Sequence, residues 1–145
     1  AAARELRVDH AMTARNIEAA KAFYARLAAG DMTAFFEILS DEVVAVSPGS
    51  RRHIPWAGTW AGKEQFGEMM NTLGEAADIE LYEIARFIPD GEDGVIVCGQ
   101  ERLRSRQTQR LAETLWVHEL TLRDGRITRF VEHYDTDTLA VALAG

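Results

Sequence analysis

Hydrophobic positions in the first half of the chain recur with helical spacing. The apolar face of a helix predicted over residues 13–29 comprises Ile17, Ala20, Tyr24, Leu27 and Ala28. Gly30 stands where a helix-terminating glycine belongs, and Asp31 is suited to cap a second, shorter helix. A third helix is expected to begin at Gly62, because the apolar residues after it follow the i, i+3, i+4, i+7 spacing of an amphipathic helix.

The second half of the chain alternates between hydrophobic and polar residues, which is typical of β-strands. Strands are predicted at residues 43–47, 79–88, 95–106, 111–122 and 127–134. Asp124 and Gly125 lie between the last two strands and favour a tight hairpin, because glycine accepts the positive φ of a primed turn. Helices first and antiparallel strands last predict a single α+β domain over residues 1–145. In it, a curved sheet wraps around three N-terminal helices, and Asp135 opens a short C-terminal tail helix.

Alternation also decides which side chains of the last two strands share a face. Trp116 and His118 fall on one face of the first strand, and Phe130, Glu132 and Tyr134 fall on one face of the second. A mostly apolar face that carries a histidine on one strand and a carboxylate on the next is more typical of a pocket lining than of a plain core.

Composition narrows the classes of function. A net charge of −7 argues against nucleic-acid binding, and no apolar stretch predicts a membrane helix or a signal peptide. Cys98 is the single cysteine, which fits a reducing compartment, so a cytoplasmic location is expected. His10, His53, His118 and His133 lack metal-ligand spacing, so neither a metal nor another cofactor is expected.

Glu132 is the first candidate for chemistry. A carboxylate among apolar groups has a raised pKa, which suits general acid/base work near neutral pH; the alternative is a structural ion pair with Arg102 or Arg129. His118 is a second candidate, because an imidazole exchanges protons at cellular pH; the alternative is a satisfied core histidine.

The breaker-rich loop at residues 48–60 is a further candidate region. His53 is interpreted as a base that closes over the pocket, or as an exposed loop residue. Trp56 and Trp60, like Trp116, are interpreted as pocket walls or as ordinary core. Tyr24 and Tyr134 carry phenols that can orient a substrate oxygen, or they are core residues with solvated hydroxyls.

Four segments of the chain resemble the nuclear transport factor 2-like superfamily: residues 23–31, 57–64, 122–127 and 134–135. The superfamily includes ketosteroid isomerases, limonene epoxide hydrolases, scytalone dehydratases and SnoaL-type polyketide cyclases. The resemblance covers about residues 17–143. It implies a cone-shaped, curved mixed sheet around the helices, with a pocket inside, and a SnoaL-like domain.

Only some of the functional residues of these enzymes are found at the matching positions of this chain. The ketosteroid isomerase pattern has a tyrosine, an aspartate that acts as the base, and a protonated aspartate. In this chain the first position is Phe23, the second has no carboxylate (the nearest candidate is His53), and the third is His118. All three positions differ, which argues against steroid isomerisation by that set.

The limonene epoxide hydrolase pattern fits better. Arg102 matches its arginine and Glu132 conservatively replaces its aspartate, whereas Arg104 and Arg51 stand where the pattern has a second aspartate and a tyrosine. The sequence does not decide which face of the sheet Arg102 points to, because a bulge near Gly99 would exchange the faces of Arg102 and Leu103.

Two hypotheses follow. The first is a cofactor-independent acid/base enzyme on a small hydrophobic substrate, of isomerase, cyclase, dehydratase or epoxide hydrolase type. Glu132, His118, His53, Arg102 and Tyr24 would be catalytic. The substrate-binding residues would be Trp56, Trp60, Trp116, Phe130, Tyr134 and Phe23. The second is a non-catalytic module that binds a small ligand or dimerises.

A homodimer is expected through the outer face of the sheet. Leu115, Val117, Val131 and His133 have outward parity there, and the resemblance implies pairing through that face.

Overall fold

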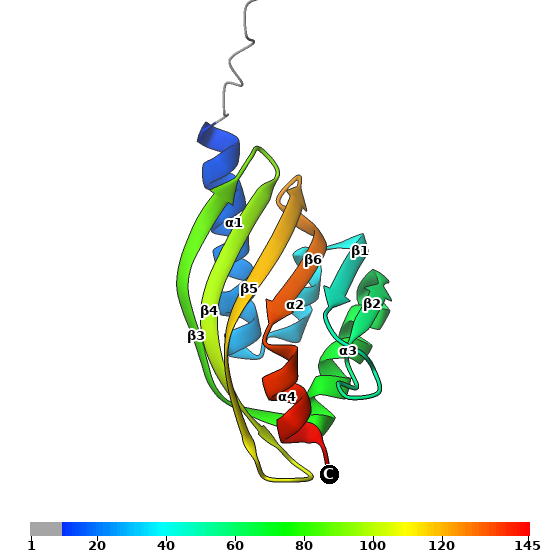
Figure 1. Ribbon diagram of the computed structural model, residues 1–145. Helices are drawn as coiled ribbons and strands as arrows, with labels where there is room; N and C mark the ends of the chain where they lie inside the picture. Colours follow the sequence, from blue (N-terminus) through cyan, green and yellow to red (C-terminus); the bar gives the residue numbers. More distant parts are fainter. Residues whose placement is uncertain (1–9) are drawn as a thin grey trace, which may run out of the picture.

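The computed structural model describes residues 10–145 (Figure 1). The helices of this part are α1 (His10–Ala29), α2 (Met32–Glu37), α3 (Gly62–Ala76) and α4 (Thr136–Leu143). The strands are β1 (Leu39–Ser47), β2 (Gly58–Ala61), β3 (Ala77–Asp90), β4 (Gly94–Ser105), β5 (Leu111–Arg123) and β6 (Arg126–Tyr134). They form one sheet in the order β2-β1-β6-β5-β4-β3, in which only β1 and β6 run parallel to each other. The prediction of an α+β fold with a curved mixed sheet around the helices is confirmed.

The helix boundaries follow the signals in the sequence. Gly30 ends α1 with a φ of 70°, a conformation in which glycine carries no steric penalty. The Asp31 side chain accepts a hydrogen bond from the Ala34 N–H at the start of α2. Asp135 caps α4 in the same way, accepting from the N–H of Thr138.

The last hairpin forms where Asp124 and Gly125 predict it. Both residues have positive φ values, 53° and 75°, and Arg123 pairs with Arg126 across the turn. This is a two-residue primed turn, and it sets the register of β5 against β6. The short edge strand β2 was not predicted. It overlaps the end of the segment interpreted as a loop and contains Trp60, which pairs with Ala45.

The long strands curve around the helices. The pairing of β3 with β4 shifts register between Ile79 and Leu81 and again between Ile84 and Arg86. Such extra residues bend a strand, so they account for part of the curvature seen in Figure 1. Helices α1 and α2 lie behind the sheet in that view, and α3 packs against β1 and β2.

Four phenylalanines from four elements join the helices to the sheet. Their ring centroids are 4.9 Å apart for Phe23–Phe35, 5.9 Å for Phe35–Phe66, 5.5 Å for Phe66–Phe130 and 5.7 Å for Phe23–Phe130. All four are buried. This closed set of aromatic contacts fixes α1, α2 and α3 over β6 and forms one wall of the space between them.

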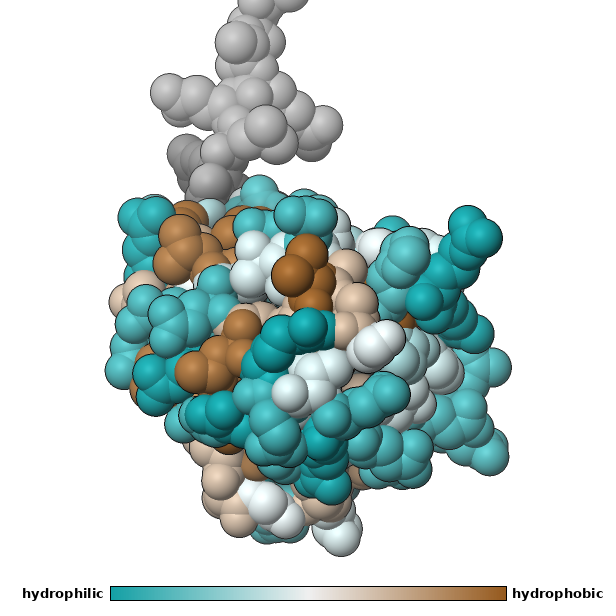
Figure 2. All heavy atoms as spheres, turned by 60° about the horizontal axis from the view of Figure 1, so that its bottom comes forward, coloured by the Kyte–Doolittle hydropathy of each residue, from teal (hydrophilic) through white to brown (hydrophobic). Residues whose placement is uncertain are grey.

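The surface differs from the interior. The face turned forward in Figure 2 is mainly hydrophilic, with hydrophobic residues in small separate patches. Among the described helices, none has both the length and the apolar character needed to cross a membrane.

Candidate active site

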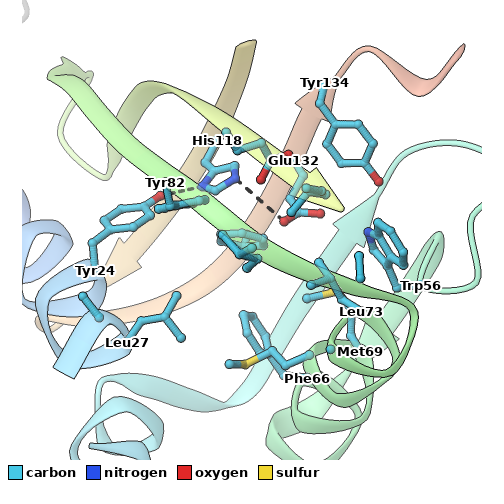
Figure 3. A pocket seen from close by; sticks show the side chains of 18 of the residues that line it. Tyr24, Leu27, Trp56, Phe66, Met69, Leu73, Tyr82, His118, Glu132 and Tyr134 are labelled. Atoms are coloured by element: carbon cyan, nitrogen blue, oxygen red, sulfur yellow. Dashed lines mark hydrogen bonds and ion pairs between the residues drawn. The ribbon is translucent and has the colours of Figure 1, made fainter. Parts of the chain in front are cut away.

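A cavity of about 560 Å³ lies inside the curved sheet, against α1 and α3 (Figure 3). Its apolar wall includes Leu27, Phe35, Phe66, Met69, Leu73 and Leu103. Its polar or ionisable lining includes Tyr24, Tyr82, Glu101, His118, Glu132 and Tyr134. A concave, mostly apolar space with a few converging polar groups is typical of a site for a small organic ligand.

His118 and Glu132 face each other across two neighbouring strands. The β5–β6 register pairs them directly, and both point into the cavity, as the alternation predicted. The His118 Nε2 and Glu132 Oε1 atoms are 3.8 Å apart. The structure therefore brings together the imidazole and the carboxylate that the sequence singled out.

Tyr24 holds the other side of the imidazole. A hydrogen bond of 2.7 Å joins its hydroxyl to Nδ1 of His118, and the two rings stack with centroids 5.8 Å apart. Burial lowers the pKa of His118 to about 3, with a smaller contribution from His133, so the imidazole is neutral at physiological pH. Burial also raises the pKa of Tyr24 well above its usual value, and Glu132 adds to this effect. The expectation that His118 exchanges protons near neutral pH is thereby corrected.

Glu132 occupies the polar end of the cavity together with Ser47 and Tyr134. The Ser47 hydroxyl donates to Glu132 Oε2 at 2.8 Å and lies 3.1 Å from the Tyr134 hydroxyl. Burial raises the pKa of Glu132 to about 7; the Ser47 hydrogen bond lowers it and the nearby Glu101 raises it. Among the described residues no arginine or lysine forms an ion pair with this carboxylate.

Glu101 is a second cavity carboxyl that the sequence analysis missed. It lies on the inner face of β4, where Thr114 donates a hydrogen bond of 3.4 Å to its Oε1. Burial raises its pKa to about 7, and the Thr114 bond acts in the opposite direction. Strict alternation counted from Leu103 would have found it, since residues 101 and 103 share a face.

Trp56 contributes an unusual donor. Its side chain lines the cavity and is 1% exposed, and its Nε1 atom has no hydrogen-bond partner within residues 10–145. The indole N–H lowers the pKa of the neighbouring Tyr134 hydroxyl, a pKa that burial raises overall, but it does not reach hydrogen-bond geometry with that oxygen. Phe23, Phe130 and Tyr134, which the sequence analysis assigns to substrate binding, also line the cavity.

Two predicted catalytic residues lie away from the cavity. His53 is exposed in a turn where its N–H donates to the Ser50 carbonyl, a geometry that turns Ile54 inward and His53 outward. Arg102 lies on the outer face, because β4 pairs with β5 without a bulge and it is Leu103 that points inward. Its partners are Glu80 and Glu113, at 3.6 and 3.5 Å, and not Glu132.

Two predicted wall residues are core residues instead. Trp60 packs in β2 beneath the Arg51 guanidinium, 4.4 Å from the ring centroid, and donates to the Trp56 carbonyl. Trp116 stacks on His118 and Tyr82, with centroids 4.2 and 4.9 Å away, so it supports the imidazole without lining the cavity.

The described residues contain no group of three or more histidine, cysteine, aspartate or glutamate side chains arranged to hold a metal ion. The polar and ionisable side chains that line the cavity supply carboxyl, imidazole, phenol, indole and guanidinium groups, the last from Arg106.

Comparisons with known proteins agree with this architecture. The chain matches the SnoaL-like domain family over residues 20–130. It is similar to an NTF2-like protein from Burkholderia xenovorans LB400, with 28% identity and a TM-score of 0.80 over 90% of this chain and 96% of that one. It is also similar to TerC, solved in co-crystals with polyporic acid, with 25% identity and a TM-score of 0.78 over 89% and 98% of the two chains. No curated protein sequence matches it.

Proposed function

Because the chain belongs to the family of SnoaL-like domains, we propose that its cavity catalyses cofactor-independent proton transfer on a small hydrophobic substrate. The reaction class is isomerisation, cyclisation, dehydration or hydrolytic ring opening, next to a carbonyl group or an epoxide. One observation carries the proposal: Glu132 lies in an apolar cavity with no lysine or arginine partner among residues 10–145, and burial raises its pKa to about 7. A structural ion pair would instead hold this carboxylate ionised to low pH.

Glu132 is the proposed base. Its carboxylate takes a proton from the carbon next to a carbonyl, and the electron pair of the broken C–H bond moves into the enolate. The protonated carboxyl then returns the proton to another atom of the substrate. A carboxyl with a pKa near the working pH suits both halves of this cycle, because neither protonation state is strongly preferred.

His118 and Tyr24 are proposed to act as positioning residues. The imidazole is neutral and is fixed by the Tyr24 hydroxyl on one side and by stacking on Trp116 below. Its Nε2 atom faces Glu132 Oε1. This arrangement holds the carboxylate toward the cavity without supplying the positive charge that would lower its pKa.

The substrate is proposed to be a largely apolar compound of modest size. The cavity volume and the phenylalanine-rich wall support this. The relative TerC, crystallised with polyporic acid, supports a small organic ligand for a chain of this fold.

Turnover of a panel of enones, epoxides and polyketide-like ketones tests the proposal. The Glu132→Gln variant is expected to lose about 10²- to 10⁴-fold in kcat/KM, the usual contribution of one general base. Glu113→Gln is the matched control, because Glu113 is an exposed carboxylate on the outer face. Full activity of Glu132→Gln on every converted substrate would contradict the assignment.

The alternative function is a non-catalytic binding module with the same cavity. The closed aromatic wall and the internal hydrogen bonds of Ser47, Glu132 and Tyr134 would serve a bound ligand equally well. Calorimetry on compounds that bind but are not converted tests this alternative. A binding module is expected to keep its affinity for them in the Glu132→Gln variant.

We also propose that two copies of the chain pair through the outer sheet face. Leu115 is 76% exposed on β5, next to the partly buried Val117 and opposite the face that forms the cavity. A large exposed leucine in the middle of a strand favours contact with another apolar surface.

A further inference from the structure

Among residues 10–145, the indole N–H of Trp56 has no acceptor within hydrogen-bond geometry, although its neighbour, the Tyr134 hydroxyl, is close enough for the indole to lower the Tyr134 pKa. An indole nitrogen can only donate a hydrogen bond, and buried polar groups in folded proteins nearly always have a partner. Trp56 is 1% exposed, its Nε1 atom is unpaired, and its side chain forms part of the cavity wall. Because the Trp56 ring lines the cavity, a ligand there can supply the acceptor that this N–H lacks.

The Tyr134 hydroxyl lies beside this donor. Figure 3 shows the Tyr134 oxygen and the Trp56 nitrogen on the same side of the cavity, near the carboxyl of Glu132. Ser47 has a single hydroxyl proton, which it donates to Glu132 at 2.8 Å; its oxygen then accepts the Tyr134 proton at 3.1 Å. When Glu132 instead donates a proton to Ser47, the chain reverses and the Tyr134 proton is free to point into the cavity.

We propose that the Trp56 N–H and the Tyr134 O–H form a subsite for a single ligand oxygen, of the carbonyl or enolate type, carried on an apolar ring system. The ligand oxygen accepts from Trp56 at all times, and from Tyr134 when Ser47 releases its proton. The subsite deepens the proposed function on which it rests: it names the group that the substrate presents and the end of the cavity where that group lies.

The subsite complements the chemistry of Glu132. Removing a proton next to a carbonyl moves negative charge onto the carbonyl oxygen. Donors fixed in an apolar cavity stabilise that charge more than they stabilise the neutral ketone. Trp56 and Tyr134 would supply these donors on one side of the substrate while Glu132 takes the proton.

Binding of a matched pair of probes tests the subsite without requiring turnover. The probes are 1-tetralone, a bicyclic ketone, and tetralin, the hydrocarbon of the same shape. In the Trp56→Phe variant, the ratio of their dissociation constants is expected to shift by about tenfold against the ketone, because one buried hydrogen bond is lost. The carbonyl stretching frequency of bound 1-tetralone is expected to be lower in the wild-type protein than in this variant.

Trp116→Phe is the matched control. Trp116 is equally buried and its Nε1 is also unpaired, but it lies outside the cavity lining. Because Trp116 supports His118 from outside the cavity, any effect of its replacement should fall on both probes alike, so the ratio of their dissociation constants should stay as in the wild type. Tyr134→Phe should shift the carbonyl frequency less than Trp56→Phe when Glu132 is ionised.

An unchanged ratio and frequency in Trp56→Phe would overturn the subsite, and would mean that the indole merely supports Tyr134. A frequency shift in a protein that converts no substrate would support the subsite and refute the proton-transfer function. Turnover that depends on Glu132, without any shift, would refute the subsite alone.

Discussion

His118 Nε2 and Glu132 Oε1 lie 3.8 Å apart at directly paired positions of β5 and β6, in a cavity that favours the uncharged form of both groups. Burial lowers the pKa of the imidazole to about 3 and raises that of the carboxyl to about 7. The two groups are therefore not a fixed ion pair. Of the two groups, Glu132 is the one that gains and loses a proton near neutral pH.

The first prediction is the pH dependence of turnover. If Glu132 acts as the base, kcat/KM should rise with pH and level off above about pH 7, where the carboxyl is ionised. His118 stays neutral through this range and should add no inflection of its own. Initial rates between pH 5 and 9 measure the profile.

Glu101→Gln is the control for that profile. Glu101 also has a pKa of about 7, so an inflection that survives its removal belongs to Glu132. A profile that falls through pH 7 would show instead that the protonated carboxyl is the active form.

The second prediction concerns stability, where His118 and Glu132 act in opposite directions. His118 has a pKa below its unfolded value of 6.5, so the unfolded chain binds more protons and the free energy of unfolding rises with pH up to about 6.5. Glu132 has a pKa above its unfolded value of 4.5, so the folded chain binds more protons and stability falls as pH rises from about 4.5 to 7. Between pH 4.5 and 6.5 the two contributions cancel in the wild type.

Single substitutions should reveal each slope. From pH 4.5 to 6.5, His118→Gln is expected to lose stability relative to the wild type, and Glu132→Gln to gain it, each by about 2–3 kcal/mol. Urea unfolding at several pH values measures this. Glu101 affects the wild type and the two variants alike, so the test is the difference between their slopes of unfolding free energy against pH. Parallel curves for the three proteins would contradict the assigned pKa shifts.

Much of the fold and the centre of the site follow from local patterns. Period-two alternation places His118 beside Glu132, and the Asp124-Gly125 turn sets the register that makes them direct neighbours. The caps at Asp31 and Asp135 mark helix starts as their side-chain chemistry requires. These features depend on a few adjacent residues, which is why the sequence predicts them.

The rest depends on contacts between distant segments. Ser47 meets Glu132 because β1 pairs parallel to β6, 85 positions away, and no periodicity encodes that pairing. His118 becomes neutral because Tyr24 and Trp116, from two other parts of the chain, bury it. Arg102 was expected at the site because the face of β4 beyond Gly99 could not be decided without the β5 register.

The third prediction concerns Gly99, where β4 passes closest to the Trp116 ring. A Cβ atom there would lie 2.3 Å from Trp116 Cζ2 and 2.1 Å from the Glu83 carbonyl oxygen. Gly99→Ala is therefore expected to destabilise the fold by about 3 kcal/mol and to disturb the stack on His118. Gly74→Ala in α3, with nothing within 4 Å, is the control and should stabilise by about 0.5–1 kcal/mol. Denaturant unfolding compares the two; equal stabilities would contradict the close approach.

The fourth prediction concerns the outer sheet face. Replacing Leu115 by glutamate places like charges opposite each other in a two-fold contact, because each copy contributes the same residue. The dimer dissociation constant is expected to rise by at least tenfold, as measured by analytical ultracentrifugation across a range of concentrations. The cavity lies on the opposite face of the sheet, so binding of 1-tetralone should persist in the monomer.

Val141→Glu is the matched control for the Leu115 change. Val141 is 60% exposed, but it lies on α4 and not on the sheet, so its replacement should leave the association unchanged. If the Val141 variant dissociated and the Leu115 variant did not, the contact would lie at the C-terminal helix instead. A chain that stays monomeric at every concentration would remove the outer face from consideration as an interface, because the exposed leucine would then have no partner copy to cover it.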